Sequence, residues 1–209
     1  MRVLIVDDHQ VVRRGVKEIF TDAFPSMQVV EAEDSKTALE FLMTQEWDLV
    51  LLDINLPGRS GLEVLEQAKR LRPKTPVLVL SAYPEEEFAI RSLKAGASGY
   101  LNKSLASDEI LAAARKVLSG GRYVTISLAE RLASTLGPDV QSAPHESLSS
   151  RELQVLRLIA SARTIKQIAA ELGLSEKTVS TYRVRLAKKL GLSSNVRLAR
   201  YALKYNLVD

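Results

Sequence analysis

Short apolar runs alternate with amphipathic segments over the first 120 residues. The runs have the length and the Val, Ile and Leu content of buried strands, and the segments between them place apolar residues at helical spacing. The expected strands are residues 2–7, 27–33, 48–53, 76–81 and 98–103. Because continuous apolar runs suit strands with both faces covered, the pattern predicts an α/β domain with a five-stranded, doubly wound parallel sheet.

From residue 148 onward the pattern is helical. The expected helices are residues 149–161, 164–172, 175–190 and 194–205. Ser149 and Glu152 have the spacing of a capping box, and Gly173 and Gly191 stand where helices must end. The stretch "TIKQIAAELGLSEKTVSTYRVRLAKKLG" is therefore two helices joined by a short turn, a helix-turn-helix signature. We expect one domain over 1–120, a linker over 121–147 and a small all-α domain over 148–209.

Charge divides the chain into the same two parts. Residues 1–120 carry 15 basic and 18 acidic side chains, whereas residues 146–209 carry 12 basic and 5 acidic ones, a net charge of +7. A basic domain favours a polyanionic partner. The absence of cysteine excludes disulfides and thiolate metal sites. No apolar run approaches the roughly 18 residues of a membrane span and no signal peptide is evident, so we expect a cytoplasmic protein with no membrane partner.

Polar side chains end four of the five expected strands. In strand order they are Asp7 and Asp8, Asp53, Ser81, and Asn102 with Lys103. Because ligands bind outside the carboxyl ends of parallel strands, we expect these groups to converge on one edge of the sheet. Two carboxylates about 4 Å apart repel by roughly 4 kcal/mol at an effective dielectric of 20, so a cation must offset them. Lys103 supplies one positive charge, and carboxylate oxygens suit Mg²⁺ or Mn²⁺.

Such a site suits phosphoryl transfer, with Asp53 as a nucleophile that becomes an aspartyl phosphate. Lys103 and the metal would neutralise the phosphoryl oxygens, and Ser81 could donate a hydrogen bond to one of them. Each residue alone is more often a turn residue or a solvated charge, and the joint placement at strand ends favours the site. We interpret His9 as a helix-start residue and His145 as a linker residue.

The motifs "VLIVDDH", "DLVLLDINLPGRSGLEVL", "VLVLSAY" and "KAGASGYLNKS" resemble the receiver domain of two-component response regulators, a flavodoxin-like fold, over nearly all of residues 1–120. The resemblance implies that Asp53 accepts phosphate from a sensor histidine kinase and that Lys103 binds the phosphate. It also implies that Ser81 and Tyr100 are the switch residues. The Mg²⁺ ligands that it implies are Asp7, Asp8, Asp53 and the main-chain carbonyl of Asn55.

The expected helix 175–190 has two unlike faces. At about 100° per residue, Val179, Leu186 and Leu190 fall on one side, which must be the core side. Val184 lies opposite them, between lysines and hydroxyls, as suits a helix in the major groove of DNA. The predicted DNA contacts are Lys177, Thr178, Ser180, Thr181, Tyr182, Val184 and Lys188.

Residues 147–209 resemble the LuxR-type helix-turn-helix, and the two halves together resemble the FixJ/NarL family, most closely its BvgA-like branch. The resemblance implies a phosphorylation-activated transcriptional regulator that is not an enzyme, binds double-stranded DNA and forms homodimers on phosphorylation or on DNA.

Two alternatives are weaker. A haloacid-dehalogenase-type phosphatase needs a second aspartate where this chain has Asn55. A DNA-binding protein with a degenerate, unphosphorylated receiver would not need the complete set of strand-end groups.

Overall fold

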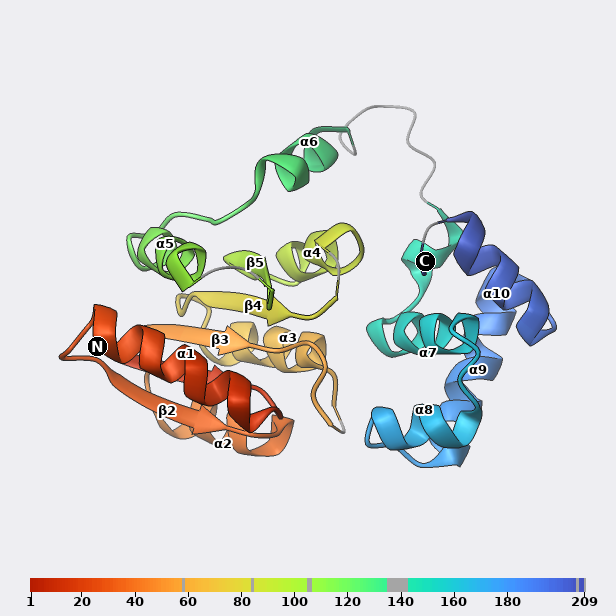
Figure 1. Cartoon of the computed structure of the whole chain (residues 1–209), viewed down its shortest axis with the longest axis horizontal. Helices are drawn as coiled ribbons and strands as arrows, with labels where there is room; N and C mark the ends of the chain where they lie inside the picture. The colour runs from red at the N-terminus through yellow and green to blue at the C-terminus, as the bar shows by residue number, and fades with distance from the viewer. Residues whose placement is uncertain (58, 84, 105–106, 135–142, 206, 209) are drawn as a thin grey trace. The chain divides into compact units, whose positions relative to one another are not determined.

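Figure 1 shows the computed structural model of the chain, which describes residues 1–209 except residues 58, 84, 105–106, 135–142, 206 and 209. The chain forms two compact units, Met1–Gly137 and Pro138–Asp209, which we call the first unit and the second unit. Among the helices of the described residues, none combines the length and the apolar character that a bilayer crossing requires.

The first unit is built on a five-stranded parallel sheet, as the sequence predicts. Its strands are β1 (Arg2–Val6), β2 (Gln28–Ala32), β3 (Leu49–Leu52), β4 (Val77–Ser81) and β5 (Gly99–Asn102). They lie in the order β2-β1-β3-β4-β5. The connection after β1 leads to β2 on one side, and the connection after β3 leads to β4 on the other side. The direction of the connections therefore reverses between the neighbouring strands β1 and β3. In open α/β sheets this reversal is where ligands bind.

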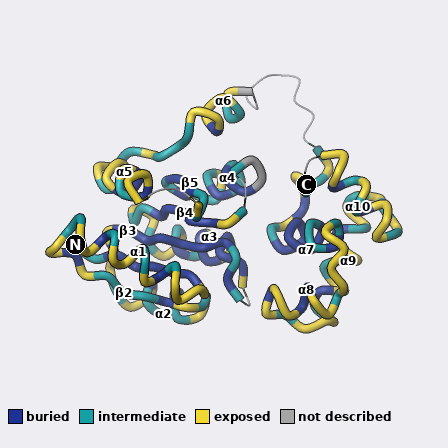
Figure 2. The backbone as a smooth tube through the Cα atoms, viewed as in Figure 1, coloured by how far each residue is buried: buried dark blue, intermediate teal, exposed yellow. Residues whose placement is uncertain are grey.

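Helices cover both faces of this sheet. They are α1 (Gln10–Ala23), α2 (Ser35–Thr44), α3 (Gly61–Leu71), α4 (Glu85–Lys94) and α5 (Ser107–Leu118). Helix α1 packs against α5, and α2 packs against α3. Val3 and Ile5 belong to the core that contains residues of α1 and α5, whereas Leu4 points to the other face because strand side chains alternate. All three are buried, and Figure 2 shows the central strands as the most buried part of the unit.

A further helix, α6 (Ile126–Ser134), follows the fifth strand-helix pair and packs against α4. It lies within the segment that the sequence predicts as a linker, but the first unit extends to Gly137 and includes it. Leu128 is buried, and Thr125 accepts a hydrogen bond from its amide, which caps the helix. Residues 135–142 of the predicted linker lie outside the described residues.

The second unit is helical, as predicted. It contains the short helix η1 (Pro144–Ser147) and the helices α7 (Ser150–Ala160), α8 (Ile165–Glu171), α9 (Glu176–Leu190) and α10 (Asn195–Lys204). The predicted capping box is present, because Ser149 and Glu152 accept each other's main-chain amide. Gly191 ends α9 with a φ of 67°, a left-handed conformation that glycine adopts without strain. Helix α7 packs against α8, α9 and α10, so it is the centre of this unit.

Candidate functional site

The carboxyl ends of the strands bring the predicted polar groups to one edge of the first unit. The amide of Asp53 donates to the carbonyl of Val6 at 2.8 Å, which continues the pairing of β3 with β1 past the last apolar residue. The amide of Lys103 likewise donates to the carbonyl of Ser81 at 2.8 Å and joins the ends of β5 and β4. The register of the sheet therefore fixes the main-chain positions from which the functional side chains extend.

Lys103 lies between two buried carboxylates. Its Nζ atom is 2.6 Å from Oδ2 of Asp7 and 2.7 Å from Oδ2 of Asp53, and both aspartates are only 2% exposed. Burial raises the pKa of Asp53, and the charge of Asp7 adds to the rise, while Lys103 opposes it. Burial alone would lower the pKa of Lys103, but attraction and hydrogen bonds from the two carboxylates raise it overall. The site therefore concentrates negative charge that one ammonium group offsets only in part.

Asp8 and His9 complete this cluster on its solvent side. Oδ1 of Asp8 is 2.8 Å from Nδ1 of His9, and the amide of His9 donates to Oδ1 of Asp7 at 2.9 Å. One ligand atom from each of Asp7, Asp8, His9 and Asp53 lies within 4.8 Å of the others. Oxygen donors at this spacing fit a divalent cation. His9, which the sequence assigns only to a helix start, belongs to the cluster.

The loop after β3 shapes the rim of the cluster. The amide of Asn55 donates to Oδ1 of Asp53 at 3.1 Å and so helps to orient the carboxylate. Gly61 then brings the chain back onto the end of β3, because its amide donates to the carbonyl of Ile54 at 2.9 Å. A Cβ atom at Gly61 would lie 1.9 Å from the carbonyl oxygen of Asp53. The sequence reasoning did not identify Gly61, although its place in "LPGRSG" is a signal for a tight turn.

The two predicted switch residues are fully buried and meet at Tyr83. Oγ of Ser81 accepts a hydrogen bond from the amide of Tyr83 at 3.1 Å. The hydroxyl of Tyr100 donates to the carbonyl of the same residue at 2.8 Å. Two residues later, Glu85 accepts a hydrogen bond from Thr125, just before α6, at 2.6 Å. The first two hydrogen bonds lie at the end of β4, and the third joins the first residue of α4 to the residue before α6.

Helix α9 of the second unit presents the predicted face to solvent. Val179 and Leu186 are buried on the core side, and Val184 is 61% exposed on the other. The exposed members of the predicted set are Lys177, Ser180, Thr181, Val184 and Lys188, while Thr178 and Tyr182 are partly buried. Thr178 bonds through its amide and hydroxyl to Ser175, the residue that caps the helix.

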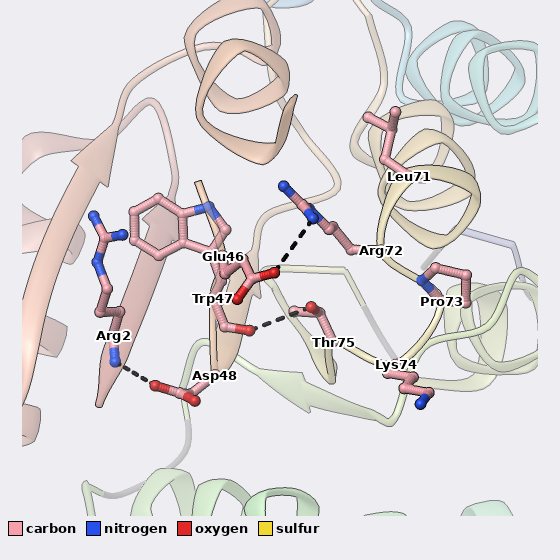
Figure 3. Close-up of a pocket in the computed structure, with 9 residues that line it drawn as sticks. All are labelled: Arg2, Glu46, Trp47, Asp48, Leu71, Arg72, Pro73, Lys74 and Thr75. Carbon is pink, nitrogen blue, oxygen red and sulfur yellow. Dashed lines mark hydrogen bonds and ion pairs between the residues drawn. The ribbon is translucent and has the colours of Figure 1, made fainter. Parts of the chain in front are cut away.

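A cavity of about 570 Å³ lies at the opposite edge of the sheet, at the amino ends of β1, β3 and β4 (Figure 3). The amide of Arg2 donates to Asp48 at 2.6 Å, and Thr75 donates to the carbonyl of Trp47 at 3.2 Å. These pairs hold the loops of that edge together. The cavity shares no lining residue with the cluster of strand-end carboxylates.

Comparisons with known proteins assign both units. Residues 3–115 match the response regulator receiver domain, and residues 146–202 match the bacterial regulatory proteins of the luxR family.

Two curated proteins align with the whole chain. The chain is 36% identical to response regulator GacA of Pseudomonas aeruginosa over 210 residues, which cover 100% of this chain and 98% of that protein. It is 35% identical to response regulator UvrY of Escherichia coli (strain K12), with 100% and 96% covered.

A solved structure is also similar over nearly the full length. It is RcsB from Salmonella enterica serovar Typhimurium, bound to promoter rprA in the presence of the phosphomimetic BeF₃⁻. The TM-score is 0.62 at 27% sequence identity, with 96% of this chain and 98% of that chain covered.

Proposed function

The chain belongs to the response regulators that join a receiver domain to a LuxR-type DNA-binding domain, and we propose that phosphorylation of Asp53 switches its binding to DNA. A sensor histidine kinase would supply the phosphoryl group. The observation that carries the proposal is the placement of Asp53, which is buried at the end of β3 in contact with Lys103 and beside two further acidic residues. The prediction of a BvgA-like branch stays a prediction.

The transfer step uses the carboxylate of Asp53 as the nucleophile. One of its oxygens forms a bond to phosphorus while the bond between phosphorus and the histidine nitrogen of the kinase breaks. The ammonium group of Lys103, which is 2.7 Å from Asp53 before the transfer, would then pair with a negatively charged phosphoryl oxygen. Asp7, Asp8, Asp53 and the carbonyl of Asn55 would hold Mg²⁺, which when bound offsets negative charge on the phosphoryl oxygens.

The switch would pass through Ser81 and Tyr100. When Asp53 carries a phosphoryl group, the hydroxyl of Ser81 donates a hydrogen bond to it, and the segment at Tyr83 shifts. Tyr100, whose hydroxyl donates to the carbonyl of Tyr83, moves with that segment. The contacts of Glu85 with Thr125 would carry the change to α6 and so toward the second unit.

The second unit would bind double-stranded DNA through the exposed face of α9. Its net charge of +7 over residues 146–209 suits a polyanion, and the exposed Val184 suits contact with a thymine methyl group. We assign base contacts to Thr181 and Val184 and a phosphate contact to Lys188. Lys177, Thr178, Ser180 and Tyr182 complete the contact set. Two second units in a homodimer would bind two half-sites.

The predicted domain boundaries, with the helix-turn-helix domain over 148–209, also belong to this proposal. We expect the fragment 146–209 to fold and to bind DNA by itself. We further propose that the protein acts in the cytoplasm, where a kinase and chromosomal DNA are both within reach, and that it has no catalytic turnover of its own on other substrates. A phosphatase would release phosphate from many substrate molecules, whereas a receiver retains one phosphoryl group and loses it slowly.

The decisive experiment is labelling with acetyl phosphate in the presence of Mg²⁺. The wild-type protein should gain one acid-labile phosphoryl group and bind DNA more tightly afterward. Asp53→Asn should abolish the labelling, and Asp8→Ala should remove the rise in melting temperature that Mg²⁺ causes in the wild-type protein. Undiminished labelling of Asp53→Asn would refute the assignment of the phosphoacceptor. Phosphorylation that leaves both DNA affinity and oligomeric state unchanged would refute the switch.

A further inference from the structure

One cation near the candidate site is buried but, in the part of the chain that the structure describes, forms its hydrogen bonds and ion pairs with neither Asp53 nor Lys103. The side chain of Arg13, on α1, is only 11% exposed, whereas that of its neighbour Arg14 is 81% exposed. A guanidinium group is costly to remove from water unless hydrogen bonds and opposite charges compensate it. The function proposed above gives Arg13 no part, so its burial calls for a physical reason.

The contacts of Arg13 join the ends of two neighbouring strands. Its Nη1 donates to the main-chain carbonyl of Asp7 at 2.7 Å in a buried hydrogen bond. Its Nε donates to Oε2 of Glu31 on β2 at 3.4 Å, and its Nη2 lies 3.9 Å from Oε2 of Glu33. Lys17 also pairs with Glu31, at 2.9 Å, so Glu31 keeps a cationic partner when Arg13 is absent.

The carbonyl of Asp7 is an informative target for this hydrogen bond. It belongs to the planar peptide that links Asp7 to Asp8, so its direction helps to set where the chain carries both carboxylates. The carboxylate of Asp7 is itself held at two points, by the amide of His9 and by Lys103. Arg13 holds the main chain of the same residue from the side of α1 and β2.

We propose that Arg13 is a positioning residue that orients the Asp7–Asp8 segment for divalent cation binding. The inference rests on the proposed function of this site. Groups that hold metal ligands in place without touching the metal commonly change metal affinity by 10-fold to 100-fold. The charge of Arg13 acts in the opposite direction, because a cation near the site repels Mg²⁺. Removing Arg13 therefore lowers the Mg²⁺ affinity if its positioning effect dominates, and raises this affinity if its charge dominates.

Two substitutions separate these effects. Arg13→Gln removes the charge and the guanidinium geometry, whereas Arg13→Lys keeps the charge but replaces the planar fork with a single ammonium group. Arg14→Gln is the matched control, since Arg14 pairs only with the exposed Glu18 among its described contacts. The readouts are the Mg²⁺ concentration that gives half of the Mg²⁺-induced rise in melting temperature, and the half-saturating Mg²⁺ concentration for acetyl phosphate labelling.

If Arg13 positions the segment, both Arg13 variants need about 10-fold more Mg²⁺ in both assays. Labelling at saturating Mg²⁺ should stay near the wild-type rate, because the nucleophile is untouched. Arg14→Gln should match the wild type. A lower Mg²⁺ requirement in Arg13→Gln together with an unchanged one in Arg13→Lys would show that only charge matters, and would overturn the proposal. Unchanged requirements in both variants would overturn it as well.

A folding defect can be recognised separately. Circular dichroism without Mg²⁺ identifies a variant that does not fold, and Glu31→Gln then replaces it as the test, because it weakens the hold on Arg13 from outside the cluster. A smaller increase in the Mg²⁺ requirement of Glu31→Gln supports the proposal, and no increase opposes it. Failure of the wild-type protein to be labelled at all would instead refute the proposed function.

Discussion

Lys103→Met should destabilise the first unit by leaving two buried carboxylates opposed. The Nζ atom of Lys103 lies 2.6 Å and 2.7 Å from the two aspartates, so each Coulomb attraction is roughly 6 kcal/mol at an effective dielectric of about 20. Burial of the ammonium group cancels much of this attraction. Removing one partner of a buried ion pair typically costs about 3–5 kcal/mol.

Thermal unfolding followed by circular dichroism measures the effect. For a unit of this size, a loss of 1 kcal/mol lowers the melting temperature by about 3–4 °C, so a loss of about 3–5 kcal/mol predicts a decrease of about 9–20 °C without Mg²⁺. The loss should shrink as the pH falls, because the pKa of Asp53 is already raised by burial and rises further without Lys103. Mg²⁺ should restore more stability to the variant than to the wild type, since the cation then offsets the same carboxylates.

The control is Lys94→Met, which replaces an exposed lysine in the last turn of α4 and should change stability by less than about 0.5 kcal/mol. The double variant Lys103→Met with Asp53→Asn should recover part of the loss, because the two residues are in contact. A loss in Lys103→Met no larger than that of Lys94→Met, or no recovery in the double variant, would refute this account of the charge balance.

Three further predictions concern DNA binding, α6 and pH. Val184→Ala should cost on the order of 1 kcal/mol of binding free energy on the best operator and flatten the preference at one base pair. Lys188→Ala should weaken binding to all sequences about equally and lower the slope of the salt dependence by about one. If titrations against single-base operator variants show that Lys188→Ala changes the sequence preference and Val184→Ala does not, the placement of α9 is wrong. Glu85→Ala should release α6 from this hydrogen bond while the Thr125 hydroxyl still caps the helix, and so should increase hydrogen exchange in α6 without phosphorylation. Unchanged exchange counts against the contact as a restraint. Burial alone would raise the pKa of Glu152, but hydrogen bonds from Lys189 and Ser149 hold this pKa below its usual 4.5. The stability that Glu152 contributes is therefore present above pH 4.5 and is lost as the pH falls through the lowered pKa. Lys189→Met should reduce this acid sensitivity in chemical unfolding curves measured at several pH values.

The regular secondary structure of this protein follows from its sequence alone. Leu49–Leu52 are continuously apolar because both faces of β3 are covered, and that pattern predicts a parallel sheet without knowledge of its neighbours. The strand-end positions of Asp53 and Lys103 follow in the same way. The exposure of Val184 on α9 is likewise a consequence of helical periodicity, which a wheel drawn from the sequence predicts correctly.

Contacts between distant segments were decided by the tertiary structure. Lys103 reaches Asp53 across 50 positions of sequence, and its 2.7 Å contact depends on the register of three strands and on a side-chain rotamer. Glycine is needed at position 61 because the chain returns there to the end of β3, where a Cβ atom would lie 1.9 Å from the carbonyl oxygen of Asp53. The burial of Arg13 is of the same kind, since a helical pattern shows which face a residue occupies but not which carbonyl lies opposite it.

The packing of α6 on α4 illustrates the same division. The sequence predicts a linker for this segment, because the pattern of a single amphipathic helix does not identify the surface that covers it. The buried Leu128 and the hydrogen bond from Thr125 to Glu85 identify that surface. Periodicity within the chain thus determined the elements and their faces, whereas the contacts that orient the site depend on distances across the folded unit, which local patterns do not encode.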